Sequence, residues 1–288
     1  MHVGVVFPHL EIGAGAEGVR GYALAVEEAG FDHLVAYDHV LGANPERPGG
    51  WAGPYIHRSL FHEVFVLLGY LAAITERIEL VTEVLILPQR QTALVAKQAA
   101  EVDVLSGGRL RVGVGIGWNP VEYEALGMDF HNRGRRIEEQ VELLRRLWAE
   151  ELVTYDGRWH RVTDAGLNPL PVRRSIPLWM GGSAEVALRR VARIADGWMV
   201  NMRLGPQLEA TLATVRGLVR EAGRDPATFG IAGRVAWKGD AGAVVRDLAR
   251  FEELGATHAS VNTMGAGLEG WRAHVDVLAA VMAPWRGR

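Results

Sequence analysis

Two glycines and a serine, Gly181, Gly182 and Ser183, end the run P-L-W-M-G-G-S at residues 177–183 and precede the helical pattern of Ala184–Ala195. An apolar strand that breaks into such a turn and then enters a helix directs several backbone N–H groups outward. The positive end of the helix dipole lies behind these groups, which makes the junction a ready phosphate site. Ser183 is also a good helix N-cap, so the same residues could serve only as a tight turn.

Asp38 and His39 stand side by side directly after the apolar run at residues 33–37. A carboxylate beside an imidazole can fix its tautomer and hold a proton near neutral pH, which is the chemistry of general acid–base catalysis. The pair could also be a loop pair that only caps a turn. Glu83 lies inside another apolar run, and because an isolated buried carboxylate is costly, we expect it to face an open end or to pair with an arginine.

The glycines at 113, 115 and 117 alternate, so they share one face of a strand end. They leave room for a flat ligand, or they serve close packing. Trp51, Tyr55 and Trp118 could form an apolar lid over a substrate. The long loop at residues 42–59 is rich in glycine and proline and could act as a gate, since loops of this length are usually functional.

Other chemistries find little support in the residues. The chain has no cysteine, which excludes disulfides, thiolate metal sites and cysteine nucleophiles. His57 and His62 are five residues apart and His9 is isolated, so no histidine pair has the spacing of metal ligands. There is no Gly-x-Ser-x-Gly elbow and no Walker loop, and the G-x-G-x-x-G spacing at residues 13–18 does not follow a strand directly.

Eight apolar strand patterns alternate with eight helical patterns, which demands a parallel sheet with helical crossovers. Eight units in 288 residues favour an α/β fold of the closed (β/α)8 TIM-barrel type over the runner-up, an open doubly wound sheet. The predicted strands cover 3–7, 33–37, 78–85, 110–115, 178–180, 198–200, 229–234 and 258–261. The predicted helices cover 16–29, 63–74, 92–105, 134–149, 184–195, 206–222, 243–254 and 268–281.

An insertion interrupts this alternation between the fourth helix and the fifth strand. Alternating residues at 152–162 surround Asp156-Gly157, which predicts a β-hairpin with a two-residue turn. No linker divides the chain, so residues 1–288 are expected to form a single domain. In a barrel of this kind the chemistry lies at the C-terminal ends of the strands, where polar and aromatic residues gather in this sequence.

Composition narrows the possible partners. Hydrophobic residues make up 49% of the chain and charged residues 23%, with a formal net charge of −3, so we expect no nucleic-acid partner. No apolar run approaches the roughly 20 residues that cross a membrane, and we expect no signal peptide. We therefore expect a cytoplasmic protein that acts on a small molecule. Apolar residues on the outer helices could pair subunits into a homodimer.

Four motifs in order resemble the bacterial luciferase-like monooxygenase superfamily across nearly the whole chain. They are L-S-G-G-R-L-R-V-G-V-G-I-G-W-N-P-V-E-Y-E-A-L-G (Leu105–Gly127), R-G-R-R-I-E-E (Arg133–Glu139), P-L-W-M-G-G-S (Pro177–Ser183) and A-D-G-W (Ala195–Trp198). The resemblance implies a (β/α)8 barrel with insertions. It also implies a flavin, FMN, or the deazaflavin coenzyme F420, bound at the C-terminal ends of the strands.

The resemblance also implies residue roles. Asp38-His39 is similar to the pair of the deazaflavin-dependent branch, in which the histidine lies near the reactive ring face. The family's strand-three bulge, often with a non-proline cis peptide, matches Thr82-Glu83. Gly115 and Asn119 match strand-four cofactor contacts. The turn that ends the fifth predicted strand, at residues 181–183, matches the phosphate loop.

The sequence departs from this branch at one position. The sugar-phosphate dehydrogenases of the branch carry a glutamate acid where this chain has Trp118, so we do not expect a sugar phosphate as substrate. We expect an oxidoreductase that transfers a hydride between F420 and a small, largely apolar organic substrate, with His39 and Asp38 in catalytic roles. The alternative is an FMN-dependent monooxygenase that uses reduced flavin and O₂. A flavin-binding or sensor protein without turnover is a third hypothesis.

Overall fold

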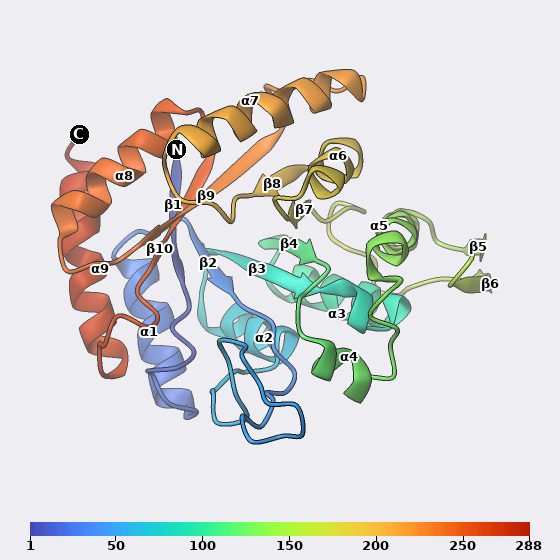
Figure 1. Cartoon of the computed structure of the whole chain (residues 1–288), viewed down its shortest axis with the longest axis horizontal. Helices are drawn as coiled ribbons and strands as arrows, with labels where there is room; N and C mark the ends of the chain where they lie inside the picture. The colour runs from blue at the N-terminus through green and yellow to red at the C-terminus, as the bar shows by residue number, and fades with distance from the viewer.

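The apolar runs of the sequence form a closed parallel barrel in the computed structural model, which describes residues 1–288 (Figure 1). Going around the barrel, the strand order is β1-β10-β9-β8-β7-β4-β3-β2. The strands are β1 (His2–Val6), β2 (His33–Ala36), β3 (Glu79–Ile86), β4 (Leu110–Gly115), β7 (Leu178–Gly181), β8 (Gly197–Met199), β9 (Gly230–Ala236) and β10 (His258–Asn262). The predicted TIM barrel is therefore confirmed, and the open sheet is wrong.

The eight predicted helices surround these strands. They are α1 (Ala16–Glu28), α2 (Val64–Ile74), α3 (Thr92–Leu105), α5 (Arg133–Ala149), α6 (Glu185–Ile194), α7 (Pro206–Glu221), α8 (Ala241–Glu253) and α9 (Gly270–Arg286). Two short elements were not predicted: the 3₁₀ turn η1 (Leu87–Gln89) and the helix α4 (Pro120–Ala125). Both follow the C-terminal ends of strands, β3 and β4, so they shape the end of the barrel where chemistry is expected.

The insertion is an antiparallel pair, β5 (Val153–Asp156) and β6 (Arg161–Ala165), which projects from the side of the barrel (Figure 1). The predicted two-residue turn is wrong, because the four residues 157–160 connect the strands. The loop closes around one carboxylate instead. Glu139 of α5 accepts the backbone N–H groups of Arg158 and Trp159, each at 2.9 Å, and of His160 at 2.8 Å.

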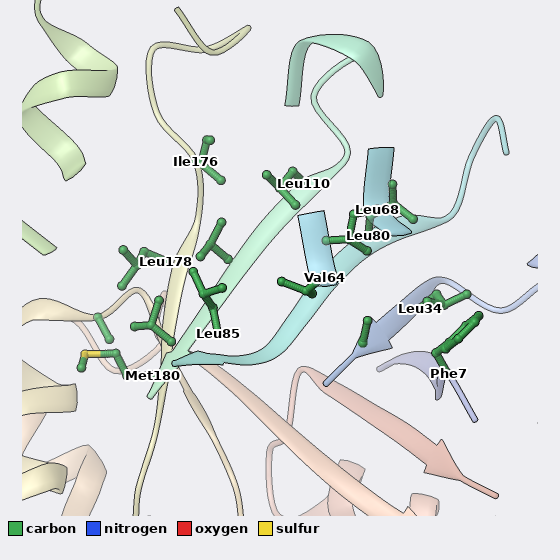
Figure 2. Close-up of a cluster of buried hydrophobic side chains, with 14 of the residues drawn as sticks. Phe7, Leu34, Val64, Leu68, Leu80, Leu85, Leu110, Ile176, Leu178 and Met180 are labelled. Carbon is green, nitrogen blue, oxygen red and sulfur yellow. The ribbon is translucent and has the colours of Figure 1, made fainter. Parts of the chain in front are cut away.

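The core has two layers, as the barrel fold requires. Between strands and helices, side chains such as Leu80 of β3 and Val64 and Leu68 of α2 pack together (Figure 2). Inside the barrel, a separate cluster fills the lumen with Val6, Val35, Val81, Trp179, Met199 and Ala232. Tyr37 and Val84 pack on this inner cluster. Together with Met199 they close the barrel below the cavity described next.

The helices expose some apolar side chains on the surface of the molecule. No helix combines the length and the apolar character that are needed to span a bilayer. Val66 and Tyr70 of α2, and Leu94 and Leu105 of α3, expose large apolar side chains. Homodimer formation through such helices stays a prediction.

Candidate active site

A cavity of about 540 Å³ opens at the C-terminal ends of the strands. Its wall takes residues from β3, β4, β7, β8 and β9 and from the segments that follow β2, β4, β7 and β8. The lining consists of Tyr37, Asp38, His39, Pro54, Tyr55, Glu83, Val84, Ile86, Gly115, Ile116, Gly117, Trp118, Asn119, Glu122, Gly181, Gly182, Met199, Val200, Asn201 and Arg234. Seven of the nine predicted site residues are among them; Thr82 and Ser183 are not.

His39 follows β2 and stands in an aromatic box. Its ring centroid lies 4.8 Å from that of Tyr55, 4.7 Å from Phe61 and 6.0 Å from Trp118. The predicted lid is partly reproduced: Tyr55 and Trp118 line the cavity, whereas Trp51 packs behind Trp118 at 5.7 Å and donates its indole N–H to the Tyr55 carbonyl at 2.8 Å. One side of the cavity is therefore aromatic.

Asp38 lines the cavity, but the structure does not bring its carboxylate to His39. The guanidinium of Arg90 holds both carboxylate oxygens, with Nη2 at 2.6 Å and Nε at 3.3 Å, and the backbone N–H of Ile86 donates to Oδ2 at 2.9 Å. Asp38 is thereby used to fix the end of β3. Asp38 and His39 are adjacent in the sequence, but their side chains contact different residues.

The carboxylate beside His39 belongs to Glu122, which was not among the predicted site residues. Its Oε1 lies 3.4 Å from His39 Nδ1, and its side chain is almost fully buried. It also accepts the backbone N–H of Val40 at 2.7 Å. Asn119 is the N-cap of α4, accepting from the Val121 N–H at 3.0 Å, and Glu122 sits in the first turn. The spacing Asn-x-x-Glu is the signal that could have revealed this helix start.

The end of β3 is irregular at the predicted bulge. The pairing of β3 with β4 shifts between Thr82 and Leu85, and the Glu83–Val84 peptide is cis, as the resemblance implied. Thr82 is buried between the strands, where its hydroxyl donates to the Gly113 carbonyl at 2.7 Å and accepts the Gly113 N–H at 3.0 Å. Thr82 therefore supports the bulge without reaching the cavity.

Val84, the second residue of the cis peptide, lines the cavity and packs against a glycine of β4. A Cβ on Gly115 would lie 2.5 Å from a Val84 methyl, and one on Gly117 2.6 Å from a methyl of Ile86. Gly113, the third alternating glycine, instead packs against Met199 below the cavity. Close packing therefore accounts for all three glycines of this series, although Gly115 and Gly117 also line the cavity.

Glu83 fulfils both halves of its expectation: it lines the cavity, and its Oε1 lies 4.0 Å from Arg234 Nη1. Burial raises the pKa of Glu83, and the charge of Arg234 opposes this rise. Arg234 also donates to the Tyr37 hydroxyl at 3.0 Å and to Asn201 Oδ1 at 2.7 Å. The single arginine of the lining is therefore already engaged with protein groups.

On the β7 side, the backbone offers hydrogen-bond donors. Gly181 and Gly182 line the cavity, and the N–H groups of Gly182, Ser183 and Ala184 donate no hydrogen bond within the chain. Ser183 is exposed and does not cap the helix, because α6 begins after Ala184. Gly182 has φ +134°, and a Cβ there would lie 2.8 Å from Cβ of Ala187. Free N–H groups at the start of a helix suit a phosphate.

Known proteins are similar to this chain in sequence and in fold. An F420-dependent glucose-6-phosphate dehydrogenase of Segniliparus rotundus is 32% identical over 211 residues, 71% of this chain and 59% of the relative. An FMNH2-dependent dimethylsulfone monooxygenase of Pseudomonas putida is 31% identical over 159 residues, 54% of this chain and 44% of the relative. An uncharacterised protein of Mycobacterium tuberculosis is 36% identical over 208 residues, 70% and 71% of the two chains.

Among solved structures, the coenzyme F420-dependent tetrahydromethanopterin reductase of Methanopyrus kandleri superposes with a TM-score of 0.78 at 17% identity, covering 98% of both chains. This likeness shows the fold. The family model described as luciferase-like monooxygenase matches residues 1–278. The chain therefore belongs to the luciferase-like monooxygenase family, whose members are F420- or flavin-dependent oxidoreductases.

Proposed function

We propose that this protein transfers a hydride between F420 and a small, largely apolar organic substrate. The observation that carries the proposal is the division of the cavity into two sides: a wall of glycines and short aliphatic side chains near free backbone donors, and an aromatic side that contains His39. Such a division suits a planar coenzyme with an anionic tail on one side and a substrate stacked against it on the other.

The residues present fit the deazaflavin at both ends. Val84 and Ile86 pack against Gly115 and Gly117 and form a wall of short aliphatic side chains, and the N–H groups of Gly182 and Ser183 would hold the phosphate. When bound, the coenzyme supplies a two-electron hydride donor or acceptor. The protein has to orient it, keep water away and manage one proton.

His39 is the group that would move this proton. Reduction of a substrate consumes a hydride at one atom and a proton at the neighbouring heteroatom, whereas oxidation releases both. His39 lines the cavity within the aromatic box, so its imidazole can give or take the proton while Tyr55 and Trp118 exclude water. Asp38 would contribute indirectly, by fixing the strand end through Arg90.

The lining favours an apolar substrate over a sugar phosphate. Trp118 and Tyr55 occupy the substrate side, and Arg234, the one arginine of the wall, already binds Tyr37 and Asn201. A sugar phosphate would need additional cationic groups to pair with its charge. The relative that acts on glucose 6-phosphate therefore supports F420 as the coenzyme of this protein, but it does not support a sugar phosphate as the substrate.

The alternative is an FMN-dependent monooxygenase that uses reduced flavin and O₂. The aliphatic wall and the free N–H groups would serve FMN equally well, and the Pseudomonas putida relative uses FMNH2. The Asp38-His39 pair after β2, which resembles that of the deazaflavin branch, is the reason for preferring F420.

Absorbance titrations with F420 and with FMN test the proposal. We expect F420 to bind with micromolar affinity and FMN to bind much more weakly. With a panel of small ketones, aldehydes and activated alkenes, oxidation of reduced F420 should depend on the protein. His39→Ala should keep F420 affinity and lose turnover by about 10²- to 10⁴-fold. Tight binding of FMN alone, with oxygen uptake from reduced FMN, would establish the alternative, and binding without any turnover would indicate a sensor.

A further inference from the structure

Glu122 is a buried carboxylate without a permanent cation. Only 1% of the residue is exposed, and His39 is the one basic side chain within 4.0 Å of its oxygens. By comparison, the buried Asp38 has Arg90 at 2.6 Å. A buried charge of this kind is costly unless hydrogen bonds and charges compensate it, so its position calls for an explanation.

Local structure compensates part of this cost. Oε1 accepts the N–H of Val40 at 2.7 Å and lies 3.4 Å from the N–H nitrogen of Leu41. Glu122 also stands in the first turn of α4, where the N-terminal end of a helix favours a negative charge. The carboxylate thus links the segment after β4 to the residues that directly follow His39.

We propose that Glu122 is the positioning residue for His39. Its Oε1 accepts a hydrogen bond from the N–H group at Nδ1 of the neutral imidazole. This hydrogen bond fixes the tautomer in which Nε2 carries a free lone pair. In this tautomer Nε2 is the nitrogen that exchanges a proton with the substrate, and the orientation of the ring is set from the side opposite to the reaction. This inference rests on the proposed function and deepens its account of the proton.

The geometry assigns this role to Glu122 rather than to Asp38. Both Asp38 oxygens are taken by Arg90 and the Ile86 N–H, at 2.6 to 3.3 Å. His39 Nδ1 faces Glu122 at 3.4 Å, longer than a normal hydrogen bond, and catalytic contacts of this length commonly shorten when substrate binds. The rings of Tyr55 and Phe61 hold the imidazole from other directions and offer no carboxylate.

Nitrogen NMR of histidine-labelled protein without cofactor tests the proposal, because the two tautomers give distinct ¹⁵N shifts. The spectra are recorded above pH 8, well above the ordinary imidazole pKa of about 6.5. His39→Gln identifies the His39 signals. We expect the Nδ1–H tautomer in the wild type. Glu122→Leu should convert His39 to the Nε2–H form that a free imidazole prefers, whereas Glu122→Gln, which retains an acceptor oxygen, should keep the Nδ1–H form.

Two control variants separate this role from a general effect. Glu124→Leu changes an exposed carboxylate on the same short helix, 3.9 Å from Arg47, and should leave the tautomer unchanged. Asp38→Asn should also leave it unchanged. An Nε2–H form in the wild type, or a tautomer that responds to Asp38→Asn and not to Glu122→Leu, would overturn the proposal. If Glu122→Leu does not fold, the wild-type and Glu122→Gln spectra still decide.

Kinetics give a second readout once a substrate is found. Glu122→Leu should lower kcat by about 10- to 100-fold, the usual effect of losing a group that orients a functional histidine, with F420 affinity unchanged. The NMR result does not depend on any cofactor, so failure of the F420 proposal and failure of the Glu122 proposal are distinguishable.

Discussion

Gly182 shows how much of the proposed cofactor site depends on a single residue. It combines a φ of +134° with a neighbour, Ala187, that leaves no room for a side chain. Gly182→Val should therefore tilt the N–H groups at the start of α6 and weaken F420 binding at least tenfold, about 1.4 kcal/mol. Gly205→Val is the matched control, because Gly205 has φ +146° and precedes α7 but does not line the cavity.

Both variants should lower the Tm, because both force a side chain into a strained backbone conformation, and Gly182→Val should lower it further through its contact with Ala187. Only Gly182→Val should change the dissociation constant for F420, measured by the quenching of its fluorescence. Equal affinities in the two variants would show that the phosphate binds elsewhere.

At the residue scale, seven of the nine site residues predicted from the sequence lie on the cavity wall, but one predicted contact does not form. His39, Glu83, Asn119 and the glycines of β4 and β7 follow from their place at strand ends. Adjacency of Asp38 and His39 in the sequence indicated a contact that the loop geometry does not allow. The partner of His39, Glu122, comes from a different strand end, and pairing between distant segments is not visible in a single sequence.

The hairpin illustrates the scale of elements, since one carboxylate organises its loop. Burial tends to raise the pKa of Glu139, but the N–H donors of Trp159 and Arg158 and the His160 ring outweigh it and lower that pKa. Glu139→Ala should therefore lower the free energy of unfolding by about 1–3 kcal/mol at pH 7. Because the folded-state pKa is below the unfolded one, this contribution should disappear as the pH falls below about 4.

Urea unfolding at pH 7 and at pH 3.5 measures the effect, and amide hydrogen exchange at residues 158–160 shows whether the loop opens. Glu185→Ala is the control, because Glu185 makes only an exposed i,i+4 pair with Arg189 at 2.9 Å. An identical loss of stability in the two variants would mean that the loop does not depend on Glu139.

The same loop explains an error of sequence reasoning at this scale. Asp156-Gly157 between alternating residues is a strong signal for a two-residue turn, but a tertiary contact with α5 supplies three hydrogen bonds that a tight turn cannot make. The long helices and strands were predictable because their apolar patterns span several turns or residues. Helix α4 was missed because its six residues are too few to show a period.

For the molecule as a whole, we expect stability in acid to depend on three histidines with lowered pKa values, the buried His9 and His33 and the half-buried His258. Burial is the main cause that lowers the pKa of His9 and of His258 to about 3, and the pKa of His33 lies well below its usual value. His33 shares a fully buried hydrogen bond of 2.9 Å with Ser260 at the end of the barrel opposite to the cavity. These groups sit where a charge would be poorly solvated.

At these three histidines the unfolded chain binds more protons than the folded chain between about pH 3 and pH 6.5, because each folded-state pKa is the lower one. The free energy of unfolding should therefore fall as the pH drops through this window, by up to about 1.4 kcal/mol per pH unit for each histidine. Urea unfolding from pH 7.5 to pH 4 measures this slope. His258→Gln should flatten it, and a slope that does not change would contradict the assignment.

The closed barrel itself was the most predictable property of the molecule. Eight strand–helix repeats leave few topologies, and the chain length excludes much smaller or larger solutions. The repeats do not indicate which coenzyme would bind at the C-terminal end of the barrel, because coenzyme preference depends on a few contacts at strand ends.

A crystal structure of the protein with oxidised F420 tests the central claim most directly. We predict that the phosphate oxygens of the coenzyme lie within hydrogen-bond distance of the Gly182 and Ser183 N–H groups, with the ring system between Val84 and the His39 side of the cavity. A phosphate bound away from the start of α6, or a ring system outside the mouth of the barrel, would contradict the account.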